Sequence, residues 1–152
     1  MIKTKKQFFL ITVSWILVAL CMAIIFAFSA QSGDASQTVS DDFTTFLGLP
    51  LSVVSFIRKT AHFFEFAGLA VLIYNALYQS SGSAKPLMSF ILTAVYAATD
   101  EFHQLFVEGR ACRVFDLFVD SCGAATGIAA LTLLILIYKK LRSTHLTKEG
   151  LL

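Results

Sequence analysis

Residues 100–120 read DEFHQLFVEGRACRVFDLFVD and lie between two long apolar segments. Their polar side chains include Asp100, Glu101, His103, Gln104, Arg110, Asp116 and Asp120. This density is unusual in a chain that is 57% hydrophobic and only 14% charged. An ionisable group at the centre of a membrane helix costs about 2.5 to 3.5 kcal/mol on insertion scales, so such groups usually face a bundle interior and mark a site. We therefore expect the rest of the chain to be a scaffold for this polar centre.

Length and composition predict one all-α membrane domain that comprises residues 1–152. A chain of 152 residues with two prolines and 57% hydrophobic residues is too apolar for an ordinary soluble domain and too short for two membrane domains. The three cysteines, Cys21, Cys112 and Cys122, are odd in number and lack metal-ligand spacing. No disulfide framework is therefore expected.

Four apolar segments predict four transmembrane helices, at about residues 8–30, 60–78, 86–107 and 114–138. The first segment is longer than the core of a signal peptide, and further apolar segments follow it. We therefore predict that it is not cleaved off and stays in the protein as the first transmembrane helix. The residues SSGSAKP predict a loop before the third helix, with Pro86 in the first turn of that helix. Residues 108–113, which include Gly109, predict a tight turn before the fourth helix.

The connection between the first two predicted spans contains an amphipathic pattern. Val39, Phe43, Phe46 and Leu47 follow one another at positions i, i+4, i+7 and i+8. This spacing predicts a short interfacial helix that lies on the membrane surface in the first external loop. Pro50 then allows a new helix to begin.

The Lys and Arg residues are distributed unevenly between the two sides of the predicted bundle. Eight of the twelve lie in the N-terminal segment, at Lys85 and in the C-terminal tail, and the other four lie on the opposite side. The positive-inside rule therefore predicts a multi-pass protein of the cytoplasmic membrane with both termini in the cytoplasm. The polar centre is then expected to face outward.

Helical spacing places the polar residues on three helix faces. The residues that share a face are Arg58, His62 and Glu65 in the second span, Asp100, His103 and Gln104 in the third, and Asp116 and Asp120 in the fourth. Each lies within about two turns of the outer end, which is within about 10 Å at 1.5 Å per residue. We therefore predict one shallow outward-facing pocket that also includes Lys59, Glu101 and Arg110. Gly123 and Gly127 form a small-xxx-small pattern below it, which permits close helix contact.

Four motifs cover most of the chain. They consist of Phe28, Ser29 and Gln31; Arg58, Lys59, His62, Phe63 and Glu65; Asp100, Glu101, Gln104, Phe106, Gly109 and Arg110; and Asp116, Asp120, Gly123 and Gly127. In these motifs the chain resembles the VanZ-like family of bacterial membrane proteins. The resemblance implies a small multi-pass protein of the bacterial cytoplasmic membrane that is linked to reduced susceptibility to teicoplanin-type lipoglycopeptides. Asp120 departs from the family pattern, in which Asn is frequent, and adds a negative charge to the pocket.

Two principal classes of function follow, with a transporter as a third. The first is a binding protein for an anionic lipid-linked cell-wall intermediate or a lipoglycopeptide at the outer leaflet. Its phosphate or carboxylate would meet Arg58, Lys59, His62, His103 and Arg110. The second is a membrane-embedded hydrolase or transferase that acts on a polyprenyl phosphate. Its base would be Asp100, Glu101 or Asp116, and its acid His62 or His103.

Each class has a weakness in the sequence. No nucleophile elbow, phosphate loop or H-E-x-x-H motif supports the enzyme. A proton-coupled transporter would have only a small path through four spans without an evident repeat. The expected partners are therefore a membrane lipid, a lipid-linked precursor or a lipoglycopeptide, and not nucleic acid. Oligomeric state stays open.

Two further interpretations of the polar residues are structural or metal-binding. Arg58 with Glu65, and Arg110 with Asp116, would form ion pairs that only stabilise the bundle. His62 and His103 each lie three residues from a carboxylate, but no paired Cys or His-x-x-x-His spacing supports a metal site. We therefore expect neither a metal nor a cofactor. The many neighbouring Phe residues are typical of lipid-facing surface and would also suit an acyl chain.

The orientation is testable by cysteine labelling. Cys112 should react with a membrane-impermeant thiol reagent in intact cells, because the predicted 108–113 turn is external. A cysteine introduced by Ser143→Cys should not react, because the basic tail is predicted to be cytoplasmic. The reverse labelling pattern would overturn both the orientation and the outward-facing pocket.

Overall fold

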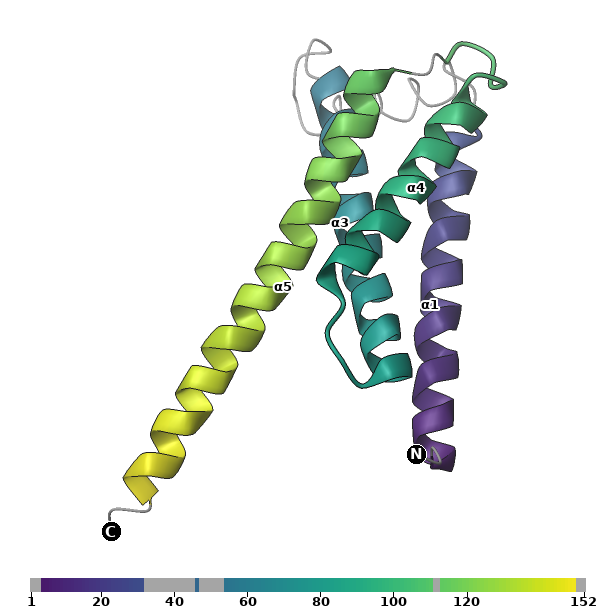
Figure 1. The fold of residues 1–152 in the computed structure, drawn as a ribbon. Coiled ribbons are helices and arrows are strands. Elements are labelled where there is room, and N and C mark those ends of the chain that lie inside the picture. Colours follow the sequence, from purple (N-terminus) through teal and green to yellow (C-terminus); the bar gives the residue numbers. More distant parts are fainter. Residues whose placement is uncertain (1–3, 32–45, 47–53, 111–112, 150–152) are drawn as a thin grey trace.

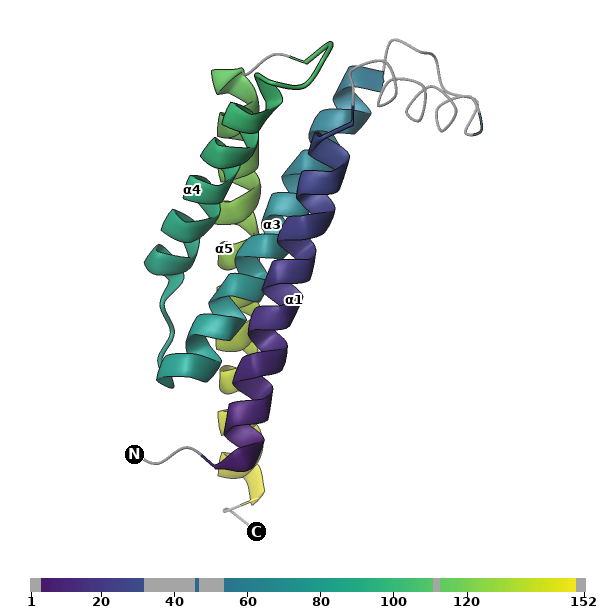
Figure 2. The ribbon, with the colours of Figure 1, turned by 90° about the vertical axis from the view of Figure 1, so that its right-hand side faces the viewer.

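The computed structural model describes residues 4–31, 46, 54–110 and 113–149, and the helices with described bounds form one bundle (Figure 1). They are α1 (Lys5–Ser29), α3 (Val54–Ser81), α4 (Pro86–Gln104) and α5 (Val114–Glu149). Successive helices run in opposite directions, so the N-terminal end of α1 and the C-terminal end of α5 lie at the same end of the molecule (Figures 1 and 2). This arrangement agrees with the predicted all-α architecture.

Three of the helices are long and apolar enough to cross a membrane. These candidate spans are Lys5–Ser29, Phe56–Ser81 and Val114–Ser143. They support a multi-pass membrane protein. Helix α4 is shorter and carries Asp100, Glu101 and His103 in its last turns, which reduces its apolar length. The fourth span therefore stays a prediction, and the interfacial helix predicted at residues 39–47 lies, apart from Phe46, outside the described residues.

Helix boundaries follow the local sequence signals, with shifts at several ends. Pro86 occupies the first turn of α4, as predicted. Gly82 and Gly109 have φ values of 72° and 73°, so each turn uses a left-handed conformation that glycine adopts without strain. Helix α4 ends at Gln104 rather than near residue 107, because Phe106 and the next residue continue with tighter turn hydrogen bonds.

Helices α3 and α5 extend beyond the membrane spans predicted within them. Helix α3 begins at Val54, before the span predicted at 60–78, and α5 continues to Glu149, past the span predicted at 114–138. No Gly or Pro interrupts the sequence between Gly127 and Gly150. The polar C-terminal tail therefore extends the helix of the last span.

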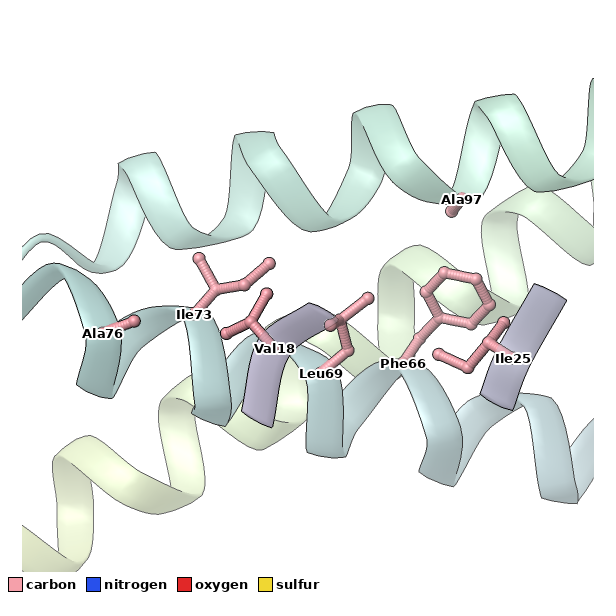
Figure 3. Close-up of a cluster of buried hydrophobic side chains, with 7 residues drawn as sticks. All are labelled: Val18, Ile25, Phe66, Leu69, Ile73, Ala76 and Ala97. Carbon is pink, nitrogen blue, oxygen red and sulfur yellow. The ribbon is translucent and has the colours of Figure 1, made fainter. Parts of the chain in front are cut away.

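The main core lies between α3 and its neighbours. Its buried side chains are Val18 and Ile25 from α1, Phe66, Leu69, Ile73 and Ala76 from α3, and Ala97 from α4 (Figure 3). Polar side chains add ties between helices. Ser89 of α4 donates to the carbonyl of Ala70 at 2.7 Å, and Tyr96 donates to that of Met22 at 2.7 Å. Such bonds join helices in a membrane, where apolar burial alone gives little driving force.

Helices α3 and α5 approach one another at backbone distance. A Cβ atom added at Gly127 would lie 2.5 Å from the Ala67 carbonyl oxygen, and one added at Gly123 would lie still closer to that of Phe63. No side chain fits between the two backbones at these positions, which confirms the predicted small-xxx-small contact. Gly123 contacts Phe63 and Gly127 contacts Ala67, so the contact recurs after four residues in both helices. The two contacts together fix the register of α5 against α3.

This contact predicts position-specific effects of adding one methyl group. Gly123→Ala and Gly127→Ala should each lower the free energy of unfolding by about 1–3 kcal/mol, because a carbonyl on a packed helix cannot move aside freely. Gly68→Ala is the matched control, since a Cβ there meets no described atom within 4 Å. It should be neutral or slightly stabilising. Thermal unfolding of the purified proteins in detergent would check this, and equal midpoints for all three variants would contradict the close contact.

Candidate functional site

A polar pocket lies where α4 ends and α5 begins, at the end of the bundle opposite the N-terminal end of α1 (Figure 1). Its volume is about 150 Å³. It is lined by Arg58, Lys59, His62, Glu101, Gln104, Gly109, Arg110, Arg113, Asp116, Val119 and Asp120. Residues from α3, α4 and α5 therefore meet at one site, as their helical spacing predicts.

Eight of the eleven predicted ligand-binding residues line this pocket, and three lie beside it. The three are Glu65, Asp100 and His103. Glu65 lies next to the pocket residue His62, with 3.9 Å between Oε2 and Nδ1. Asp100 belongs to a buried network described below. His103 packs edge-on against Phe26, with ring centroids 4.4 Å apart.

The basic side chains of the pocket differ in how they are held. Lys59 forms an ion pair with Asp116 and lies over the ring of Phe115, 4.5 Å from its centroid. Among the described residues, Arg58 has no carboxylate within ion-pair distance. Lys59 is thus compensated, whereas Arg58 keeps its guanidinium available in the pocket wall.

Arg110 joins the pocket to the end of α1. Its Nε donates to the carbonyl of Gln31 at 3.0 Å, and a terminal nitrogen donates to that of Phe28 at 3.2 Å. These carbonyls lie at the negative end of the α1 dipole, and that of Phe28 also accepts a hydrogen bond of 3.4 Å from the backbone N–H of Gln31. Burial lowers the pKa of Arg110, and the nearby Arg58 guanidinium lowers it further.

These contacts correct the ion pairs that a purely structural role predicts. Asp116 pairs with Lys59 and not with Arg110, whose guanidinium is used by backbone carbonyls. Glu65 contacts His62, and no ion pair with Arg58 is found among the described residues. The pair of Lys59 with Asp116 joins α3 and α5, so spacing within one helix could not reveal it, whereas His62 and Glu65 are three residues apart in α3.

The acidic side of the pocket is more deeply buried. Asp120 is only 2% exposed, and its Oδ1 lies 3.9 Å from Nδ1 of His62. Glu101, also buried, accepts a hydrogen bond of 2.9 Å from the backbone N–H of Arg113. In the part of the chain that the structure describes, no group of three His, Cys, Asp or Glu side chains could hold a metal ion.

A buried hydrogen-bond network supports the pocket from behind. The Ser29 hydroxyl of α1 donates to Oδ2 of Asp100 at 2.9 Å. Nε2 of Gln104 donates to the Ser29 hydroxyl oxygen at 2.9 Å and to Oδ2 of Asp100 at 3.2 Å. All three side chains are buried. This network ties the end of α1 to the last turns of α4, and so holds Gln104 in the pocket wall.

Three residues of the site were not among the predicted ligand-binding residues, namely Ser29, Arg113 and Val119. Ser29 belongs to the Phe-Ser-x-Gln motif at the end of the first span, and this motif is the signal that could have identified it. Arg113 follows the predicted turn, where nothing in the spacing indicates that it reaches the pocket.

The fold and site together define a multi-pass α-helical membrane protein with a mixed-charge pocket at one end of its bundle. The family model described as VanZ/LLP1 matches residues 14–137, which is most of the chain. The protein therefore belongs to the VanZ/LLP1 family, in agreement with the motif resemblance. No curated protein and no solved structure matches the chain.

The buried network predicts an unequal cost of removing two hydroxyl groups. Ser29→Ala should destabilise the protein by about 1–3 kcal/mol, because it leaves Gln104 and Asp100 without one of their buried partners. Ser121→Ala is the control, since its hydroxyl bonds only to the Leu117 carbonyl of its own helix. Thermal unfolding of both variants in detergent gives the comparison. Equal losses would mean that the network contributes nothing beyond a single helix hydroxyl.

Proposed function

We propose that this VanZ/LLP1 family protein binds an anionic lipid-linked cell-wall intermediate in the polar pocket and thereby reduces susceptibility to teicoplanin-type lipoglycopeptides. The observation that carries the proposal is the available guanidinium of Arg58 in a pocket at the end of a membrane bundle. Lipid phosphates lie at this depth of a bilayer. A planar guanidinium can make two charge-assisted hydrogen bonds to such a phosphate.

The charge of the pocket wall also favours an anion. Four basic side chains, those of Arg58, Lys59, Arg110 and Arg113, share it with three carboxylates. One carboxylate, Asp116, is already paired with Lys59. Three guanidinium groups, those of Arg58, Arg110 and Arg113, therefore remain in the wall as groups that can contact a negatively charged headgroup.

Pocket size favours a lipid headgroup over a whole antibiotic. The volume of about 150 Å³ is below the range of roughly 300–1,000 Å³ that is typical of sites for drug-sized ligands. A lipoglycopeptide is far larger than such a ligand and would place only one of its groups in the pocket. A phosphate with its adjoining atoms is a better match, while the acyl or polyprenyl chain would lie against the exposed Phe102, Phe106 and Phe118.

The binding function has more support than the hydrolase or transferase alternative. Of the five candidate acids and bases, Asp100 and His103 do not line the pocket, whereas Glu101, Asp116 and His62 do, and Asp116 is paired with Lys59. Asp100 is instead occupied by Ser29 and Gln104.

The proposed orientation places the pocket at the outer surface of the bacterial cytoplasmic membrane and both termini in the cytoplasm. Lys5, Lys6, Lys85, Lys139, Lys140 and Arg142 belong to helix ends or loops away from the pocket (Figures 1 and 2). Their position agrees with the positive-inside rule. In this arrangement α4 crosses the membrane as the fourth span, with its polar last turns at the outer interface.

Substitution of the two arginines should separate binding from scaffolding. Arg58→Lys should weaken binding of undecaprenyl phosphate and of a lipid II analogue about tenfold, the effect of losing one charge-assisted hydrogen bond of about 1.5 kcal/mol. Arg110→Lys should mainly lower the unfolding temperature, because it removes the bonds to the end of α1. Binding to the purified proteins is measured against a neutral lipid of equal chain length.

The same variants provide the test in cells. In a susceptible bacterial host, the wild type should raise the teicoplanin concentration that inhibits growth, and Arg58→Gln should abolish this effect while the protein still accumulates in the membrane. Equal binding of charged and neutral lipids by the wild type would refute the proposal. So would unchanged binding of the charged lipids by folded Arg58→Lys.

A further inference from the structure

Asp120 is a buried acid in the pocket wall whose carboxylate is incompletely hydrogen-bonded. It is 2% exposed, and its Oδ1 accepts no hydrogen bond from any described residue. His62 Nδ1 lies 3.9 Å away, which is beyond hydrogen-bond distance. A buried carboxylate without donors is unusual, because such groups are normally hydrogen-bonded or paired with a positive charge. Among the described residues, His62 is thus within ion-pair distance of Asp120, but none donates a hydrogen bond to its Oδ1.

The basic groups of the pocket do not fill this role. Lys59 is paired with Asp116, and the Nε of Arg110 is bonded to the carbonyl of Gln31. Neither Arg58 nor Arg113 forms an ion pair with Asp120 among the described residues. Arg58 and Asp120 thus line the same pocket without pairing with each other.

A ligand with only an anionic group would match half of this pocket. Its phosphate would gain from Arg58, but it would also lie in the same small volume of about 150 Å³ as the Asp120 carboxylate. Two negative charges that share a small, poorly solvated pocket repel each other more strongly than they would in water. A positive donor on the ligand, adjacent to its phosphate, removes this conflict.

We propose that the ligand carries a protonated primary amine next to its phosphate, and that Asp120 accepts a hydrogen bond from this amine while Arg58 binds the phosphate. The proposal rests on the phosphate recognition by Arg58 in the proposed function, and it differs from that function in requiring a zwitterionic headgroup instead of a purely anionic one. An ammonium group supplies both the charge and the donor that Asp120 lacks. Two sources offer this chemistry, namely an ethanolamine phospholipid and an amino sugar linked to a polyprenyl phosphate.

The test compares each amine with its N-acetylated form. Acetylation removes the positive charge and leaves the phosphate and the lipid chain intact. The probes are phosphatidylethanolamine, a polyprenyl phosphate amino sugar and their two N-acetyl derivatives, each offered to the purified full-length protein in detergent. The wild type should bind at least one amine about tenfold more tightly than its acetylated form, the effect of one charge-assisted hydrogen bond. Which amine shows the preference identifies the source.

Two variants assign the preference to Asp120. Asp120→Asn keeps the size of the side chain and should reduce the amine preference to about twofold or less, while binding of the acetylated lipids is retained. Asp116→Asn removes a different carboxylate of the same pocket, one that is already paired with Lys59, and should keep the preference. An unfolding curve shows that each variant is folded.

The outcomes also distinguish this inference from the proposed function. If amines and acetylated forms bind equally and both more tightly than diacylglycerol, phosphate recognition stands and the amine proposal is overturned. An amine preference that persists in folded Asp120→Asn overturns it as well. If none of the lipids binds more tightly than diacylglycerol, both proposals fail. Should Asp120→Asn not fold, equal binding of the amine and acetylated lipids by the wild type still overturns the amine proposal.

Discussion

The close contact between α3 and α5 is the constraint on which the pocket depends. Gly123 and Gly127 place the α5 backbone against the carbonyls of Phe63 and Ala67. Along the same faces toward the end of the bundle, this register brings α5 carboxylates opposite basic side chains of α3. The ion pair of Lys59 with Asp116 follows directly from it. A larger residue at either glycine would separate the helices and the charges that they carry.

Charges at the end of a membrane bundle must be compensated, and this site compensates them in different ways. Lys59 uses a carboxylate and an aromatic ring. Arg110 donates to two carbonyls at the end of α1, where the negative end of the helix dipole favours a positive charge. Asp100 uses a serine and an amide from within the bundle. The groups with fewer described partners, Arg58 and Asp120, are the ones through which a ligand would be recognised.

Helix α4 combines two functions in a short length. Its apolar part packs Ala97 into the core and donates from Ser89 to α3 (Figure 3). Its last turns carry the polar side chains that reach the pocket or the network behind it. Because polar residues occupy its last turns, α4 has too little apolar sequence to be recognised as a membrane span by length and composition. Helices α1, α3 and α5 are recognised as spans by the same criteria. Membership of the VanZ/LLP1 family agrees with a bundle built around this polar end.

The sequence by itself determined the helices, the loop at Pro86, the polar faces and the glycine contact, because each depends on local propensity or on helical periodicity. Five of the pocket residues followed from those faces, namely Arg58, His62, Gln104, Asp116 and Asp120. Only the tertiary structure decided which charges pair, that Arg110 binds the end of α1, and that Ser29 belongs with Asp100. These partners are distant in sequence, and a hydrogen bond forms or fails within a few tenths of an ångström. Such distances depend on the rotation and register of packed helices, which periodicity within one helix does not specify.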